Sequence, residues 1–503
     1  MSSTLPERPH LDHLRRQARE LHRALLSGDA AAQARAAPYR LGPPPKLSGA
    51  QLVLAREHGF DSWPQLVQEV ERRNALALPD AAFVQRVLEL VFGHGWHVPQ
   101  PARALALLRS ERASGQTQHL IFALLLGDLK AVQRALAGTD VSTPLPPLGA
   151  PPLAYAAASP LARVDEFRPG VVATVQWLLS QGADPNSLWA DPARPDEKLP
   201  VLYSAVSRAS CFETVEALLQ AGANPNDNES LYHATDQTDR RIIAALVHAG
   251  ARWQGTNALY RQLDHDALDH LSQVLELGAD VREPGPEGGP LHHAITRGRS
   301  LPFVKQLLAA GADPAVRDAQ GRTAAELAAR LGDAETAAHL ADLGHGFVPS
   351  PQEAFLAACA AGDGPAARAH LAAHPKAIQQ LDAHALRLLP DQAQRGRLDA
   401  VRLMLDLGWP VDVRGDWHAS ALNQAAFRGD AVMAKLLLDH GARWHERNGY
   451  GGDTVGSCLH AAINEPNPAG DYAAVLSLLV ADGAPAPKDA DNLPDELRAL
   501  LSA

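Results

Sequence analysis

The chain has 503 residues, of which 46% are hydrophobic, and a formal net charge of −11. This composition is typical of a folded chain, and the negative charge argues against general nucleic-acid binding, because phosphate binding needs an electropositive surface. No apolar run reaches about 18 residues and the start lacks a signal-peptide core, so we expect no membrane span and a cytoplasmic location. The three cysteines match neither a zinc spacing nor a disulfide framework, so no metal or other cofactor is expected.

Residues 1–76 predict a small helical unit. Within residues 11–27, apolar side chains recur at spacings of three and four, which places them on one face of a helix. Ser48 and Ser62 are each followed three residues later by Gln, which is the pattern of a capping box and predicts two further helices. We expect three helices here, with Phe60 and Trp63 in a small core.

Residues 80–137 predict two irregular pairs of helices. An insertion in the first pair contains His94 and His97, which are three residues apart in a loop with Gly and Pro. Because no third ligand lies nearby in sequence, we interpret them as exposed side chains rather than metal ligands. A short closing helix is expected in residues 489–503.

Residues 307–333 contain the clearest signals for helix ends. Gly311 follows an apolar run and suits the left-handed position that closes a helix. Pro314 cannot continue that helix, because proline lacks the N–H donor. Thr323 and Glu326 form a capping box, which predicts the start of the next helix.

A glycine of this kind recurs after successive apolar runs. Gly278, Gly311 and Gly344 are 33 residues apart, which is the period of a helix-pair repeat. The full set is Gly182, Gly222, Gly250, Gly278, Gly311, Gly344, Gly408, Gly441 and Gly483. Because a single helix pair cannot bury its apolar face alone, this recurrence predicts a stacked array.

The repeated stretch resembles the ankyrin repeat. The matching positions are Gly311, Ala312, Asp313, Asp318, Gly321 and Thr323. The resemblance implies an all-α ankyrin-repeat solenoid of about twelve repeats. We expect an N-terminal helical cap at residues 1–76 and two parts of the array at residues 77–345 and 346–503, since residues 345–352 interrupt the pattern. The helical segment ahead of the array is similar to those of many bacterial ankyrin proteins.

No catalytic constellation is recognisable in the sequence. His292 and His460 occupy the histidine place of the ankyrin helix start, and the resemblance implies that such a histidine bonds backbone in a neighbouring turn. Cys359 and Cys458 stand among small apolar residues and are interpreted as buried. We therefore expect no enzyme activity.

The resemblance implies non-catalytic binding of another protein through the concave and hairpin face. Arg317, Arg414 and Arg447 lie six residues after a repeat glycine, at a hairpin position, and Trp417 lies at a hairpin tip. Arg and Trp are enriched in binding hot spots, so these four residues are the candidate partner-binding site for an acidic or mixed peptide surface. We expect a monomer. Two alternatives stay open: an enzyme with a site in the groove or under the insertion at residues 188–198, and a self-associating structural array.

Overall fold

In the computed structural model, the described residues are 5–6, 8–42, 44–93, 99–110, 120–192, 196–285 and 288–485. His94, His97 and the expected closing helix at residues 489–503 therefore lie outside the described residues. The chain forms two compact units, which we call unit 1, within residues 1–252, and unit 2, within residues 253–501. The domain boundaries expected after residues 76 and 345 stay predictions.

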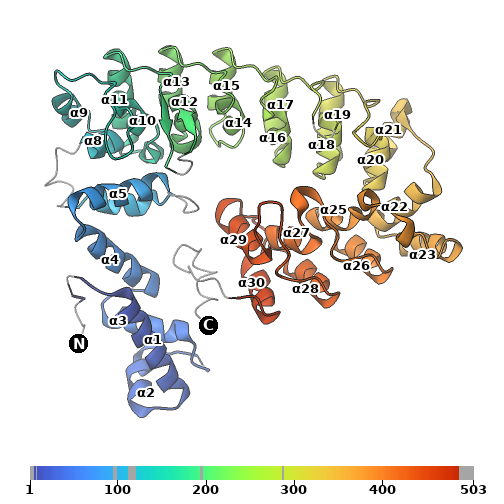
Figure 1. The fold of residues 1–503 in the computed structure, drawn as a ribbon, viewed down its shortest axis with the longest axis horizontal. Helices are drawn as coiled ribbons and strands as arrows, with labels where there is room; N and C mark the ends of the chain where they lie inside the picture. Colours follow the sequence, from blue (N-terminus) through green and yellow to red (C-terminus); the bar gives the residue numbers. More distant parts are fainter. Residues whose placement is uncertain are drawn as a thin grey trace. The chain divides into compact units, whose positions relative to one another are not determined.

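Unit 1 consists of short helices and one small hairpin of strands (Figure 1). Its helices are α1 Leu11–Leu26, α2 Ala30–Ala36, α3 Leu47–Glu57, α4 Trp63–Leu76, α5 Asp80–Phe92, α6 Pro101–Leu108, α8 Leu120–Leu126, α9 Leu129–Ala135, α10 Pro152–Ala157, α11 Arg168–Ser180, α12 Val201–Ser204, α13 Phe212–Gln220, α14 Ser230–Ala234 and α15 Arg241–His248. Its strands are β1 Leu188–Ala190 and β2 Lys198–Pro200, which pair antiparallel.

The described part of the first 76 residues forms four α-helices, one more than expected. The additional helix, α2, starts where the side chain of Asp29 accepts a hydrogen bond from the backbone N–H of Ala32. The capping box expected at Ser48 is wrong: α3 begins at Leu47, so Ser48 lies inside the helix and cannot cap its start. Ser62 does cap α4, and the core with Phe60 and Trp63 is confirmed.

The insertion at residues 188–198 is anchored by a buried tryptophan. Trp189 on β1 packs against Phe92 and Tyr155, and its Nε1 donates to the hydroxyl of Ser204 at 3.0 Å. The two strands were not predicted, because each contains only three residues and shows no alternating pattern.

Unit 2 continues the same construction. Its helices are α16 Ala258–Asp264, α17 Leu268–Glu276, α18 Pro290–Thr296, α19 Leu301–Ala309, α20 Ala324–Arg330, α21 Ala334–Leu340, α22 Pro351–Ala361, α23 Gly364–Ala373, α24 Ala383–Leu386, α25 Leu388–Gln394, α26 Leu398–Asp406, α27 Ala421–Arg428, α28 Ala431–Asp439, α29 Thr454–Asn464 and α30 Tyr472–Ala481.

Within each unit the helices form pairs, and the first helix of a pair stacks on the first helix of the next. In unit 2 the inner layer comprises α16, α18, α20, α22, α25, α27 and α29. All nine repeat glycines have a left-handed backbone, with φ between 86° and 98°, a region that favours residues without a Cβ. The expected all-α repeat solenoid is confirmed. No described helix is both long enough and apolar enough to cross a membrane.

Unit 2 turns back on itself between α20 and α25 (Figure 1). After α21 comes a π turn, Ala341–His345, in which Gly344 has a φ of 88°. Beyond it, α22 begins after the cap residue Ser350, whose side chain accepts from the backbone N–H of Glu353. The interruption expected at residues 345–352 therefore lies where the array changes direction.

The turn brings α25 against helices that precede it by many residues. Gln392 Nε2 donates to the carbonyl oxygen of Leu331 at 3.2 Å, and the buried guanidinium of Arg395 donates to the carbonyl oxygens of Ile295 and Thr296. The last carbonyls of a helix have no partner within the helix. Arg395 donates to carbonyls at the ends of α18 and α20, and its positive charge opposes the negative ends of these helix dipoles.

Candidate functional site

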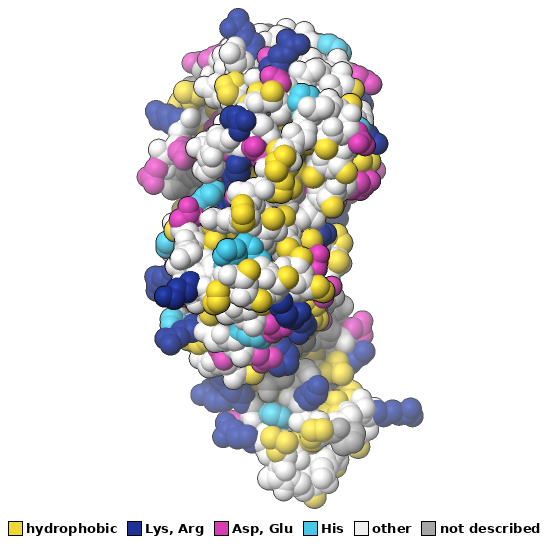
Figure 2. All heavy atoms as spheres, turned by 90° about the vertical axis from the view of Figure 1, so that its right-hand side faces the viewer, with side chains coloured by type: hydrophobic (Ala, Val, Ile, Leu, Met, Phe, Trp, Pro, Cys, Tyr) yellow, Lys and Arg dark blue, Asp and Glu magenta, His cyan; other side chains and the backbone are white. Residues whose placement is uncertain are grey.

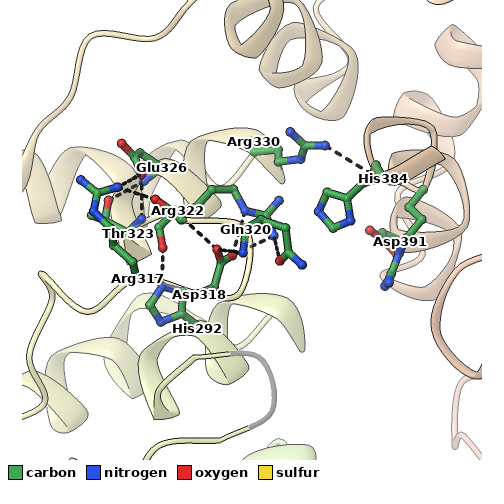
Figure 3. A network of polar contacts seen from close by, with 12 residues as sticks. His292, Arg317, Asp318, Gln320, Arg322, Thr323, Glu326, Arg330, His384 and Asp391 are labelled. Atoms are coloured by element: carbon green, nitrogen blue, oxygen red, sulfur yellow. Dashed lines mark hydrogen bonds and ion pairs between the residues drawn. The ribbon is translucent and has the colours of Figure 1, made fainter. Parts of the chain in front are cut away.

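A cavity of ≈ 250 Å³ lies at the turn of unit 2, between α20 with its preceding hairpin loop and α24–α25 (Figure 3). We call it the bend pocket. Its charged and titratable lining residues are Asp318, Arg322, Arg330, His384, Arg387 and Asp391. Figure 3 shows Arg330 pointing toward His384, with Gln320 and Arg322 on the hairpin side.

The hairpin side of the pocket is held by one carboxylate. Asp318 accepts the backbone N–H groups of Gln320 and Arg322, at 2.9 and 2.8 Å, and also the Nε–H of Arg322 at 2.8 Å. Gly321 takes a left-handed φ of 76° so that the loop can close. The Asp of the repeat pattern thus fixes both the backbone of this loop and the direction of the arginine.

The hairpin is also tied to its neighbours on both sides. Nε2 of the buried His292, on α18, lies 3.0 Å from the carbonyl oxygen of Arg322, and its Nδ1 faces the N–H of Gly289. Thr323 and Glu326 form the expected capping box at the start of α20. The backbone role expected for His292 is therefore present.

The role expected for His460 is wrong. The helix α29 begins at Thr454, with Asp453 as its cap, so His460 lies well inside the helix and is exposed. The expectation placed His460 at the helix start, whereas the helix begins six residues before it. At the preceding repeat, the place of the histidine is taken by Asn423, which donates to the carbonyl oxygen of Glu446 at 3.2 Å.

Each arginine of the bend pocket is held by a carboxylate. Arg322 pairs with Asp318 at 2.8 Å, and Arg330 pairs with Glu353 at 2.9 Å. Arg387 pairs with Asp416 at 2.5 Å and lies 3.6 Å from Asp391. These contacts come from the hairpin, from α22, from α25 and from the loop before α27, so the three guanidinium groups are positioned by the fold.

The pKa values of the pocket groups are shifted by burial and, at His384, also by three nearby arginines. The pKa of His384 is lowered, first by burial and then by Arg322, Arg330 and Arg387. Burial also lowers the pKa of Arg330, whose side chain is only 8% exposed. Burial raises the pKa of Asp391 to about 6, despite the nearby Arg387. The arginines therefore dominate the field at the imidazole.

An arginine recurs at the end of four inner helices. Arg297, Arg330, Arg395 and Arg428 end or directly follow α18, α20, α25 and α27, and two of the intervals are 33 residues. Arg428 Nη1 donates to the carbonyl oxygen of Gln394 at 3.0 Å, so it links the end of α27 to the end of α25. Sequence reasoning missed this arginine series, although the 33-residue interval was visible.

Three of the four predicted partner-binding residues come together in adjacent hairpins. Arg414 Nη1 lies 3.6 Å from a carboxylate oxygen of Glu446, the residue before the exposed Arg447. The carbonyl oxygen of Trp417 accepts the backbone N–H of Gly449 at 2.5 Å. Arg414 and Trp417 thus lie on one hairpin, which contacts the next hairpin, where Arg447 is exposed.

The hairpin with Arg447 also carries an exposed residue that the sequence reasoning missed. Tyr450 is 80% exposed in the tight loop closed by the backbone N–H of Asn448 on the carbonyl of Gly452. It could have been found by aligning this loop with residues 318–322, where Gln320 holds the equivalent place. We call Arg414, Trp417, Arg447 and Tyr450 the tip cluster.

Trp417 is exposed, as predicted, but one side of its ring is covered. The side chain is 47% exposed, and the guanidinium carbon of Arg297 lies 5.3 Å from the ring centroid. The fourth predicted residue, Arg317, lies on an earlier hairpin, where its guanidinium contacts the Gly321 carbonyl and the Glu326 carboxylate. Arg317 is 58% exposed and is not joined to the tip cluster by a described contact.

Two cysteines and one tryptophan outside these sites are buried in the core. Cys359 and Cys458 are fully buried, and burial raises the pKa of each thiol to about 12, so the thiols are protonated at neutral pH. Trp253 is buried, and its Nε1 donates to the Leu277 carbonyl. Among the described residues, no group of three or more His, Cys, Asp or Glu side chains is placed to hold a metal.

The fold and the repeated hairpins define a helical repeat array, and comparison with known proteins identifies its class. Family models described as "Ankyrin repeat" and "Ankyrin repeats (many copies)" match residues 289–319 and 389–438. The chain is an ankyrin-repeat protein, and such repeats indicate a scaffold for protein–protein interaction.

Two curated relatives match part of the chain. One is XBAT34 of Arabidopsis thaliana, provisionally named an E3 ubiquitin-protein ligase, which is 36% identical over 110 residues, or 20% of this chain and 29% of that protein. The other is an ankyrin repeat-containing protein of Treponema pallidum, 31% identical over 143 residues, or 28% of this chain and 38% of that protein. The chain thus spans less than two fifths of the length of either relative.

Among solved structures, the ankyrin repeat domain of Bcl-3, a member of the IkappaB protein family, is similar to part of the chain. The sequences are 21% identical, the alignment covers 41% of this chain and 92% of that domain, and the TM-score is 0.35.

Proposed function

We propose that this protein is a non-catalytic scaffold that binds a partner protein through the hairpin tips of unit 2. The observation that carries the proposal is the tip cluster, in which Arg414, Trp417, Arg447 and Tyr450 gather on adjacent hairpins. Arg, Trp and Tyr are the side chains most enriched in binding hot spots. Arg317, on an earlier hairpin, belongs to the same proposal as a separate contact point.

The chemistry of the cluster favours an acidic or mixed peptide surface. A guanidinium group can bind a carboxylate with two parallel hydrogen bonds, and Arg447 is exposed. The Trp417 backbone carbonyl is tied to Gly449, so the loop that carries the ring is held to the next hairpin. A surface held in this way loses little conformational freedom on binding.

Catalysis at the bend pocket is the alternative, because buried titratable groups gather there. In the described part of the chain, no hydrogen bond joins the His384 ring to Asp318 or Asp391, so the pocket lacks a base oriented by an acid. The arginines, in contrast, are all oriented. This arrangement favours binding over catalysis.

The same proposal includes a cytoplasmic monomer without a nucleic-acid or membrane partner. On the face shown in Figure 2, basic and acidic side chains of the described residues are interspersed, and the net charge is −11. A polyanion such as nucleic acid is bound by a continuous basic surface.

The test compares partner recovery by three forms of the full chain. The first is unchanged, the second carries Arg414→Glu, Trp417→Ala and Arg447→Glu, and the third is a matched control. All three are checked first for equal thermal unfolding, and bound proteins are then quantified across a range of salt concentrations. We expect the second form to lose the salt-sensitive partner.

The matched control carries the same kinds of change on outer helices. Arg368→Glu, Val432→Ala and Arg402→Glu alter exposed residues of α23, α28 and α26. This control should recover the partner as the unchanged chain does. Equal recovery by the tip variant, with the same dependence on salt, would show that the tip cluster is not the binding site.

A further inference from the structure

We propose that the bend pocket binds a small oxyanion, a carboxylate or a phosphate group, between Arg322, Arg330 and Arg387. This site is separate from the tip cluster and does not depend on the partner binding proposed above. The three guanidinium groups come from the hairpin, from the end of α20 and from the loop between α24 and α25, and they line one cavity. Only the turn of unit 2 brings these segments together.

The volume of the cavity limits the size of the ligand that it can hold. Pockets for drug-sized ligands have volumes of about 300–1,000 Å³, whereas the bend pocket has ≈ 250 Å³. It therefore suits a single anionic group on a small molecule or on one side chain, and not a helix or a nucleotide chain.

The arginines are prepared to receive such a group. A guanidinium has five N–H donors, and the described hydrogen bonds of Arg322 use Nε and Nη2, to Asp318 and Gln320. Arg330 uses Nη1 toward Glu353 and Nη2 toward the His384 carbonyl, the latter at a long 3.4 Å. Because carboxylates hold the guanidinium groups in place, a ligand need not order these side chains itself.

The lining itself carries more cations than carboxylates, because three arginines face Asp318 and Asp391. Glu353 and Asp416, which pair with Arg330 and Arg387, are not part of the lining. Asp318 is fully engaged with its own loop and with Arg322. The lowered pKa of His384, caused partly by the three arginines, agrees with a positive field in the pocket. An oxyanion would compensate that field.

The test uses the full chain with two free probes, inorganic phosphate and glutarate, and a third carried on a peptide, acetyl-Gly-Glu-Gly-amide. Each is titrated against sodium chloride at equal ionic strength, while thermal unfolding and hydrogen exchange are measured. We expect saturable stabilisation by at least one probe, because a ligand that binds only the folded state raises stability. Slower exchange should be confined to residues 318–331 and 384–395. The most effective probe identifies whether the group is free phosphate, a free carboxylate or a glutamate side chain.

A variant that places a carboxylate in the pocket tests whether the anion binds there. His384 lines the pocket, and in His384→Glu a carboxylate takes the place of the imidazole. We expect this variant to weaken probe binding about tenfold or more, because two like charges at close range repel. His374→Glu, an exposed change on the segment after α23, is the matched control and should respond as the unchanged chain does.

Two results would overturn the proposal. One is the absence of any saturable response beyond that to chloride in the unchanged chain. The other is an equal response by the unchanged chain and His384→Glu, which would place the anion elsewhere. Arg322→Gln gives a second measure, provided that its thermal unfolding is first shown to remain cooperative.

Discussion

The guanidinium of Arg395 donates to the carbonyl oxygen of Ile295, one hundred residues earlier in the chain. Arg395 follows α25 and Ile295 lies near the end of α18, so this one contact joins two repeats on opposite sides of the turn in unit 2. Burial lowers the pKa of Arg395 to about 10, which leaves it charged at neutral pH. A buried cation of this kind is retained because helix-end carbonyls surround it.

Replacing this arginine should therefore destabilise the turn. Arg395→Leu removes the described donor of the Thr296 carbonyl, whereas the Ile295 carbonyl keeps the backbone N–H of Gly298, and a buried unsatisfied group costs about 1–3 kcal/mol. We expect a loss of about 1–3 kcal/mol in the free energy of unfolding, measured with urea. Arg402→Leu, on the exposed side of α26, should change it by less than about 0.5 kcal/mol. Equal losses of unfolding free energy in Arg395→Leu and Arg402→Leu would show that the contacts of Arg395 do not stabilise the turn.

A second prediction concerns the leucines at the end of α19. Leu307 is completely buried, whereas the next residue, Leu308, is only half-buried. Leu307→Ala should cost about 2–5 kcal/mol, as for other core leucines, and Leu308→Ala should cost clearly less. Because repeats contact mainly their neighbours, faster hydrogen exchange should centre on adjacent helices. A uniform increase over the described residues would contradict this expectation.

A third prediction compares His292 and His460, which were both expected to bond backbone in a neighbouring turn. His292 is 1% exposed and bonds backbone on both ring nitrogens, so His292→Ala leaves a cavity and removes the described acceptor of the Gly289 N–H, while the Arg322 carbonyl keeps only the N–H of Asp318. We expect a loss of about 2–4 kcal/mol in unfolding free energy. His460→Ala, on the exposed face of α29, should cost less than about 0.5 kcal/mol. Denaturant unfolding of both variants at pH 8 provides the comparison, and similar losses would refute the distinction.

The raised pKa of Asp391 predicts a pH-dependent term in stability. Its folded-state pKa is about 6, above the ordinary 3.8, because burial disfavours the charged form. The contribution of this group is therefore fully present below about pH 3.8 and is lost as the pH rises through 6. Asp391→Asn cannot ionise, so relative to the unchanged chain it should gain about 1–3 kcal/mol between pH 4.5 and 7.5.

That comparison needs a control for the other titrating groups. Asp439→Asn changes an exposed carboxylate of α28 that pairs with Lys435. Its unfolding free energy, relative to the unchanged chain, should vary by less than about 0.5 kcal/mol over the same range, as for an exposed pair. If Asp391→Asn shows no relative gain in unfolding free energy over this pH range, burial does not raise the pKa of Asp391 and the prediction is wrong.

Features that depend on a few neighbouring residues could be predicted from the sequence. Thr323 and Glu326 cap α20 with each other, and Gly311 closes α19 with hydrogen bonds to the turn just before it. Such contacts join residues two to four positions apart in the sequence, so the sequence pattern alone predicts them. The helix pairs, the all-α class and the exposure of Trp417 follow from the same kind of signal.

The candidate sites needed the tertiary structure, because their residues meet only where the array turns. Arg322 and Arg387 line one pocket although 65 residues separate them, and Arg297 covers Trp417 from a helix four repeats earlier in the inner layer. The direction of an array depends on small rotations between successive helix pairs and on one π turn. These rotations arise from the packing of whole helices against one another, so they cannot be predicted from residue spacings in the sequence.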